Sequence, residues 1–117
     1  MKSKNLIDSF KYAFEGIFTA IKKEKNIKIH VFIMILVIIA GIVLKISKFE
    51  WIICIILFGI VIAGEMFNST IETIIDMVMP NKNDMAKKAK DISAGAVLVL
   101  SISASIVGIS IFVEKLC

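Results

Sequence analysis

Three carboxylates and one amide recur along a stretch of chain that is otherwise largely apolar. The stretch spans residues 51–79 and carries Glu65, Asn68, Glu72 and Asp76 in its second half. At about 100° per residue, a helix places Glu72 about 20° to one side of Glu65 and Asp76 about 20° to the other. Asn68 lies about 60° from Glu65 on the same side as Glu72. The sequence therefore predicts an acidic ladder along one helix face.

An acidic ladder at membrane depth needs an explanation, because inserting one charged side chain costs about 2.5–3.5 kcal/mol. With a rise of about 1.5 Å per residue, this ladder runs about 16 Å from mid-membrane toward the cytoplasmic surface. Asp76, and to a lesser degree Glu72, have the simpler alternative of reaching interfacial water. Glu65 is predicted to lie too deep for that. Carboxylates lining a wet groove bind divalent metal, relay protons or act as general bases.

Further charged positions lie at the same predicted surface. Glu24 ends the N-terminal helix, and Lys90 with Asp91 opens the last apolar stretch. A helix N-terminus favours anions and a lysine beside it adds a charge for phosphate, although Lys90 alone is also explained as a topology-setting lysine. Carboxylates, a lysine and a helix start together suit magnesium-bound nucleotide, because phosphoryl transfer needs mainly positioning and charge stabilisation. No Walker-type loop or soluble protein-kinase signature accompanies them.

Membrane-spanning helices are the elements that must position these residues. The chain has 117 residues, of which 58% are hydrophobic, which is too apolar for an ordinary soluble domain and too short for two domains. Three stretches approach the roughly 20 apolar residues that one span needs. We expect an all-α membrane protein with a single domain over residues 1–117 and spans at 29–45, 50–79 and 91–113. No alternating pattern typical of a membrane β-barrel occurs.

Residues 1–28 predict an amphipathic helix at the membrane surface. Phe10, Phe14, Ile17, Phe18 and Ile21 recur at three- and four-residue intervals. Acidic residues interrupt this segment, unlike the apolar core of a signal peptide. Such a helix lies in the headgroup layer with its apolar face toward the acyl chains. The alternative is a soluble amphipathic helix that packs on the other helices.

The lysines predict the orientation of the chain. Seven lie at or before residue 28 and four lie between the second and third spans, whereas the first loop has two and the C-terminal tail one. Positive charge stays on the cytoplasmic side, so we expect a cytoplasmic N-terminus and an external C-terminus. The net charge of +4 then reflects topology and anionic lipid, not nucleic-acid binding. Cys54 and Cys117 lack metal-ligand spacing and receive no role.

Two motifs resemble the prokaryotic diacylglycerol kinase and undecaprenol kinase family, and the resemblance covers nearly the whole chain. They read Glu65-x-x-Asn68-x-x-Ile71-Glu72-x-x-x-Asp76 and Ala89-Lys90-Asp91-x-x-Ala94-x-Ala96-Val97. The resemblance implies a homotrimer in the bacterial cell membrane that transfers the γ-phosphate of MgATP to a lipid hydroxyl at the cytoplasmic surface. Small residues in the third span permit close helix approach but do not set the subunit number.

The resemblance also implies a role for each matching residue on the acceptor and metal side. Glu65 would be the catalytic base that deprotonates the lipid alcohol, with Asn68 beside it to position the reactants. Glu24 and Glu72 would hold the magnesium that bridges the ATP phosphates. The segment from Glu24 to His30 resembles the Gram-positive branch, whose members favour undecaprenol over diacylglycerol. His30 would then contact the lipid, or it is an interfacial histidine without chemistry.

The implied nucleotide contacts come from three parts of the chain. Lys90 would contact phosphate, Asp91 the nucleotide, and Asp76 would support the same side. Tyr12 resembles the family's nucleotide-contacting tyrosine, and its alternative role is that of an interfacial aromatic anchor. The loop at residues 80–84 departs from the family pattern, because Asn83 stands where relatives often have a histidine.

Two rival functions remain from the sequence. A small proton-coupled transporter would use Glu65 and Glu72 as a relay and need no MgATP. A non-catalytic partner in a larger complex would tolerate neutralisation of Glu65. An assay for lipid phosphorylation distinguishes a kinase from both alternatives, because neither the transporter nor the non-catalytic partner would phosphorylate lipid.

Overall fold

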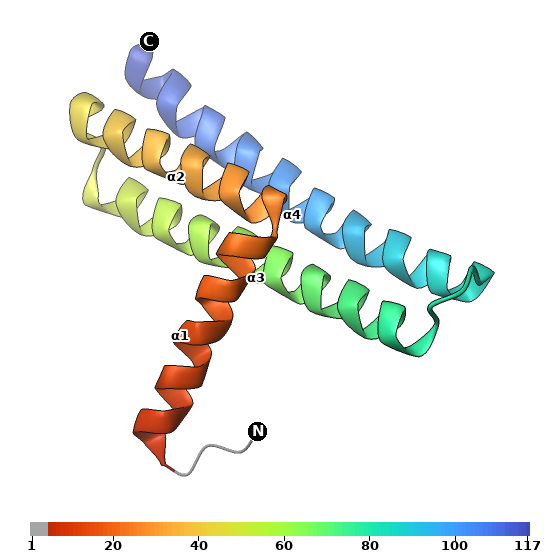
Figure 1. The fold of residues 1–117 in the computed structure, drawn as a ribbon. Helices are drawn as coiled ribbons and strands as arrows, with labels where there is room; N and C mark the ends of the chain where they lie inside the picture. Colours follow the sequence, from red (N-terminus) through yellow and green to blue (C-terminus); the bar gives the residue numbers. More distant parts are fainter. Residues whose placement is uncertain (1–4) are drawn as a thin grey trace.

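The protein forms four α-helices in a computed structural model that describes residues 5–117 (Figure 1). They are α1 at Leu6–Lys23, α2 at Lys25–Leu44, α3 at Lys48–Val78 and α4 at Asp84–Leu116. No strand occurs in this part of the chain. α2, α3 and α4 are each long and apolar enough to cross a membrane. The predicted all-α membrane fold is confirmed.

Helix α1 leaves the bundle at a steep angle, as a surface helix must (Figure 1). Asn5 caps its start by accepting a hydrogen bond from the Asp8 backbone N–H at 2.9 Å. Its phenylalanines at positions 10, 14 and 18 are exposed, and none of its residues is buried. The helix ends at Lys23, before the expected boundary at residue 28, because Glu24 has an extended backbone that redirects the chain into α2.

Helices α3 and α4 are longer than a membrane crossing requires. At about 1.5 Å per residue, the 31 residues of α3 extend about 47 Å, against about 30 Å of hydrocarbon. The 20 residues of α2 match that thickness. α3 and α4 therefore run on together past the start of α2 (Figure 1). We call these paired ends, residues 68–78 of α3 and 84–93 of α4, the projecting hairpin.

The expected start of the third span at Lys90 and Asp91 is wrong as a helix start. Helix α4 begins at Asp84, where the Asn83 side chain accepts hydrogen bonds from the backbone N–H groups of Met85 and Ala86 at 2.9 and 3.1 Å. Lys90 lies about 9 Å along the axis from this start. The unpaired amides that attract anions are confined to the first turn, so they do not assist Lys90.

A cluster of buried hydrophobic residues lies at the end of the bundle away from the projecting hairpin. Ile46, Cys54 and Ile111 are buried there, with Trp51 and Phe112 packed against them. Cys54 thus fills the core as a small apolar side chain.

The same end of the bundle is tied by polar contacts. Ser47 and Glu50 form a capping box at the start of α3. Glu50 also pairs with Lys115 near the end of α4 at 3.1 Å. These contacts fix the ends of α3 and α4 relative to each other.

Glycine at position 41 permits the close approach of α2 to α3. A Cβ atom there would lie 2.7 and 2.9 Å from two ring atoms of Trp51. A Cβ at Gly59 of α3 would meet no atom within 4 Å.

We therefore expect Gly41→Ala to lower the melting temperature of the purified protein in detergent, because overpacking a tight contact costs about 1–3 kcal/mol. Gly59→Ala is the matched control and should leave the melting temperature unchanged or raise it. Equal melting temperatures for Gly41→Ala and the unaltered protein would show that the Trp51 contact is not a packing constraint.

Candidate functional site

Glu65 is a buried carboxylate with one partner among the described residues. The residue is 5% exposed. Its Oε1 lies 3.2 Å from Nε2 of His30, which comes from the first part of α2. A buried charge is costly unless it is paired and hydrogen-bonded, so this contact explains how the bundle retains Glu65. The sequence placed His30 near the lipid and did not identify it as the partner of Glu65.

Glu65 lies level with the first part of α2, because its partner His30 is close to the start of that helix. His30 is five residues into α2, which corresponds to about 8 Å along the helix axis. The middle of α2 is about 15 Å from its start. The ladder therefore starts level with the first part of α2 and continues into the projecting hairpin, and its origin at mid-membrane stays a prediction.

Asn68 lies between the two glutamates of the ladder and contacts Glu72. Its Nδ2 donates a hydrogen bond to Glu72 Oε1 at 3.3 Å. Its Oδ1 is buried and has no hydrogen-bond partner among residues 5–117. A buried acceptor without a donor carries a cost. Asn68 Oδ1 is thus free to accept a hydrogen bond from a bound molecule.

A polar cavity of about 270 Å³ surrounds Glu65 and Asn68. It lies between the first part of α2, the middle of α3 and the middle of α4. Its lining residues are Asn26, His30, Glu65, Asn68, Ala94, Val97, Leu98 and Ser101. Asn26 and Ser101 were not predicted as site residues, although Asn26 lies in the segment from Glu24 to His30 that resembles the Gram-positive branch.

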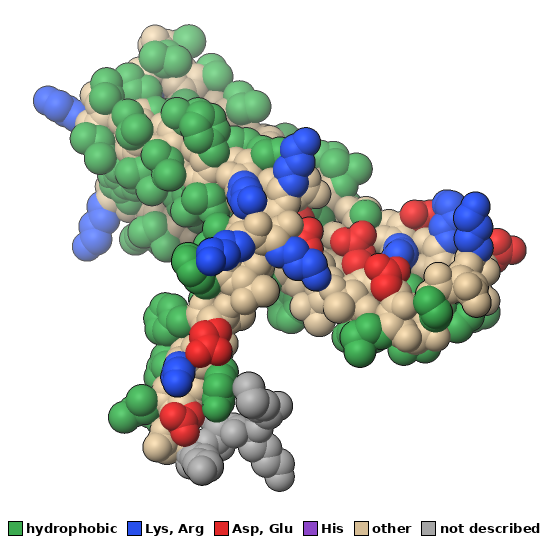
Figure 2. Space-filling view, viewed as in Figure 1, with side chains coloured by type: hydrophobic (Ala, Val, Ile, Leu, Met, Phe, Trp, Pro, Cys, Tyr) green, Lys and Arg blue, Asp and Glu red, His purple; other side chains and the backbone are tan. Residues whose placement is uncertain are grey.

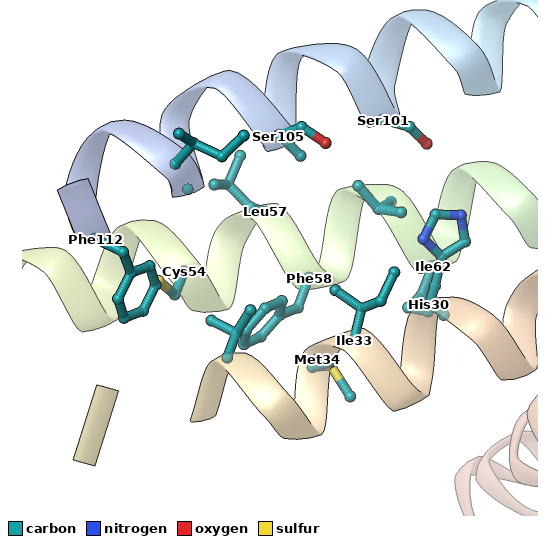
Figure 3. A pocket seen from close by; sticks show the side chains of 15 residues that line it. His30, Ile33, Met34, Cys54, Leu57, Phe58, Ile62, Ser101, Ser105 and Phe112 are labelled. Carbon is teal, nitrogen blue, oxygen red and sulfur yellow. The ribbon is translucent and has the colours of Figure 1, made fainter. Parts of the chain in front are cut away.

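An apolar groove of about 340 Å³ adjoins the polar cavity, and His30 and Ser101 line both. Figure 3 shows its side chains directed into the space between α2, α3 and α4, with Ile33, Met34 and Phe58 on one side and Phe112 at the far end. From Ser101 to Phe112 the groove follows α4 for about 16 Å. A molecule with a polar end and a long apolar chain matches this pair of cavities.

Glu24 is brought to the acidic ladder by a contact that the sequence did not predict. Ser69 of α3 donates a hydrogen bond from Oγ to Glu24 Oε1 at 2.6 Å. Ser69 lies one turn after Glu65 and just before Glu72, so the Glu24 carboxylate joins the ladder between them. The sequence indicated only that Ser69 lies beside the acidic ladder, and did not predict its contact with Glu24.

The donor set near Glu24 and Glu72 fits a magnesium ion that arrives with phosphate. No cluster of three or more histidine, cysteine or acidic side chains suited to metal occurs in residues 5–117. Magnesium in nucleotide sites is held by one or two carboxylates, with water and substrate phosphates completing its shell. Two carboxylates of the ladder match this requirement.

The projecting hairpin carries two ion pairs. Lys90 Nζ lies 2.5 Å from Asp76 Oδ1 and joins α4 to α3. Lys87 Nζ lies 2.7 Å from Asp91 Oδ2 within α4. Acidic and basic side chains gather on this part of the surface, whereas the other end of the bundle is mainly apolar (Figure 2). Lys90 is thus joined to the ladder through Asp76. Asp91 pairs with Lys87 of its own helix and not with a residue of the ladder.

Tyr12 is not brought to the ladder within one chain. It lies twelve residues before Glu24, which corresponds to about 18 Å along α1. Helix α1 extends away from the other three helices (Figure 1). A nucleotide contact by Tyr12 therefore stays a prediction.

Comparison with known proteins identifies the family. The sequence profile described as prokaryotic diacylglycerol kinase matches residues 11–112. The chain is 35% identical over 108 residues to the undecaprenol kinase of Bacillus subtilis (strain 168), covering 92% of this chain and 88% of that one.

Two further relatives carry a different name. The chain is 34% identical over 105 residues to the diacylglycerol kinase of Synechocystis sp. (strain ATCC 27184 / PCC 6803 / Kazusa), covering 89% of this chain and 60% of that one. It is 31% identical over 95 residues to the diacylglycerol kinase of Haemophilus influenzae (strain ATCC 51907 / DSM 11121 / KW20 / Rd), covering 81% and 80%. The chain belongs to the prokaryotic diacylglycerol kinase family and is a membrane lipid kinase.

Proposed function

We propose that this protein transfers the γ-phosphoryl group of MgATP to the hydroxyl of undecaprenol. The observation that carries the proposal is the buried Glu65 carboxylate in a polar cavity that adjoins an apolar groove. A lipid alcohol placed there has its hydroxyl beside Glu65 and its chain among the apolar side chains of α2, α3 and α4.

On the side where the lipid binds, the site supplies a base, Glu65, and a hydrogen-bond acceptor, Asn68 Oδ1. The lipid hydroxyl donates its hydrogen bond to Asn68 Oδ1 or to Glu65 as it settles in the polar cavity. Glu65 then takes the proton as the hydroxyl oxygen bonds to the γ-phosphorus. The bond from that phosphorus to the bridging oxygen breaks, and ADP leaves with the electron pair. Base catalysis of this kind contributes about 10²–10⁴-fold.

The donor side lies on the projecting hairpin and at Glu24. Glu24 and Glu72 would hold the magnesium, which would supply positive charge to the phosphates. Asp76 holds Lys90 close to the ladder before nucleotide binds. When nucleotide binds, Lys90 exchanges this contact for a phosphate oxygen. Asp91 and Tyr12 are proposed to contact the nucleotide. Because α1 points away from the ladder, Tyr12 suits a site completed by a second copy of the chain, as in the proposed homotrimer.

The choice of undecaprenol rests on the Bacillus subtilis relative, which is aligned over most of its length. Diacylglycerol is the alternative acceptor, because the other relatives carry that name and both lipids have a primary hydroxyl. A proton-coupled transporter is the more distant alternative. We further propose that the N-terminus and the projecting hairpin face the cytoplasm of a bacterial cell, where MgATP is available, and that the C-terminus faces outward.

We expect Glu65→Gln to lower lipid phosphorylation at least about 100-fold, because the amide cannot accept the proton. Purified protein in detergent with radiolabelled MgATP, offered undecaprenol and diacylglycerol in parallel, measures both the loss and the acceptor preference. Glu114→Gln is the matched control, since Glu114 is exposed near the end of α4 away from the projecting hairpin. Full activity of Glu65→Gln would overturn the base assignment, and faster turnover of diacylglycerol would overturn the acceptor.

A second expectation concerns magnesium. Glu24→Gln and Glu72→Gln should raise the magnesium concentration needed for half-maximal activity, because each removes one anionic ligand while preserving side-chain size. Titration of magnesium at fixed ATP measures the shift, with Glu15→Gln on the exposed part of α1 as control. Unchanged magnesium dependence in both variants would contradict the metal assignment.

A further inference from the structure

We infer that His30 is a positioning residue for Glu65. Its ring N–H anchors one carboxylate oxygen, so that the other oxygen faces the polar cavity and the lipid hydroxyl. This inference rests on the proposed function of Glu65 as the base. It gives His30 a different role from the lipid contact expected from the sequence.

The contact itself is the first support. Nε2 of His30 and Oε1 of Glu65 are 3.2 Å apart, and no other polar partner of Glu65 occurs among residues 5–117. A carboxylate only accepts hydrogen bonds. The tautomer that pairs with ionised Glu65 therefore carries its hydrogen on Nε2. Removing His30 would leave the carboxylate free to rotate in the cavity.

The place of His30 between the two cavities is the second support. The side chain lines both the polar cavity and the apolar groove, and Figure 3 shows it at one end of the groove. A lipid whose chain follows the groove reaches the polar cavity beside this ring. Glu65 held from that side presents its other oxygen to the arriving hydroxyl, which is the alignment that proton transfer requires.

The two roles of His30 predict different kinetics. A residue that contacts the lipid changes the lipid KM when it is removed. A residue that orients the base changes kcat, because its effect is realised when the proton moves. The length of the replacement side chain separates them further. A glutamine amide nitrogen reaches about as far as Nε2, whereas an asparagine amide is one methylene shorter.

The experiment compares His30→Ala, His30→Asn and His30→Gln in purified protein with MgATP and undecaprenol. We expect kcat to fall about 10–100-fold in the alanine and asparagine variants, because each loses one hydrogen bond to a charged group. Glutamine should restore kcat to within about threefold of the unaltered protein. The KM values for lipid and MgATP should not change. Lys28→Ala, at an exposed position of the same helix, is the control and should be neutral.

Other outcomes would overturn the positioning role. A raised lipid KM with unchanged kcat would assign His30 to lipid binding. An equal loss in all three variants, together with a lowered melting temperature in detergent, would assign it to folding alone. Absence of lipid kinase activity in the unaltered protein would instead reject the proposed function, so the two failures are distinguishable.

Discussion

An ionisable side chain inside an apolar bundle must be paired or it destabilises the fold. Glu65 meets this constraint through His30, and the contact determines how α2 and α3 can pack at that level. Three uncharged polar residues, Asn26, Asn68 and Ser101, line the remaining space around the carboxylate. The cavity that these residues line together with Glu65 has room for a further polar group.

The different lengths of the helices divide the molecule into two chemical zones. Where α2 runs beside α3 and α4, the interior is apolar and holds the groove. Beyond the start of α2, the projecting hairpin carries charged side chains that suit phosphate and metal. Glu65 lies where these zones meet. A reaction between a charged phosphate donor and a lipid acceptor needs a base at the place where the charged zone and the apolar zone meet.

Periodicity and composition predicted much of the fold but little of the pairing between helices. The shared face of Glu65, Glu72 and Asp76 follows from helical spacing alone. The start of α4 was misplaced because the apolar pattern begins later than Asn83, whose side chain caps the helix. The contact between His30 and Glu65 joins residues 35 apart, and spacing within one helix contains no information about it.

The position of Glu24 shows the same limit. Its approach to the ladder depends on the extended backbone that breaks α1 from α2 and on the hydroxyl of Ser69. Neither feature has a sequence pattern specific enough to predict. Likewise, Gly41 faces Trp51 only because α2 turns back against α3. The motifs suggested roles for individual residues, but the distances between those residues could be obtained only from the three-dimensional structure.

The most direct test of the central claim locates the bound lipid. A polyprenol that carries a photoreactive diazirine in its first isoprene unit would be bound to the protein in detergent and activated by light. Mass spectrometry of the products then identifies the labelled residues. We expect labelling at residues that line the polar cavity or the adjoining end of the groove, such as Leu98 and Ser101, and we expect excess undecaprenol to suppress it. Labelling confined to the exposed face of α1, or insensitive to competitor, would contradict it.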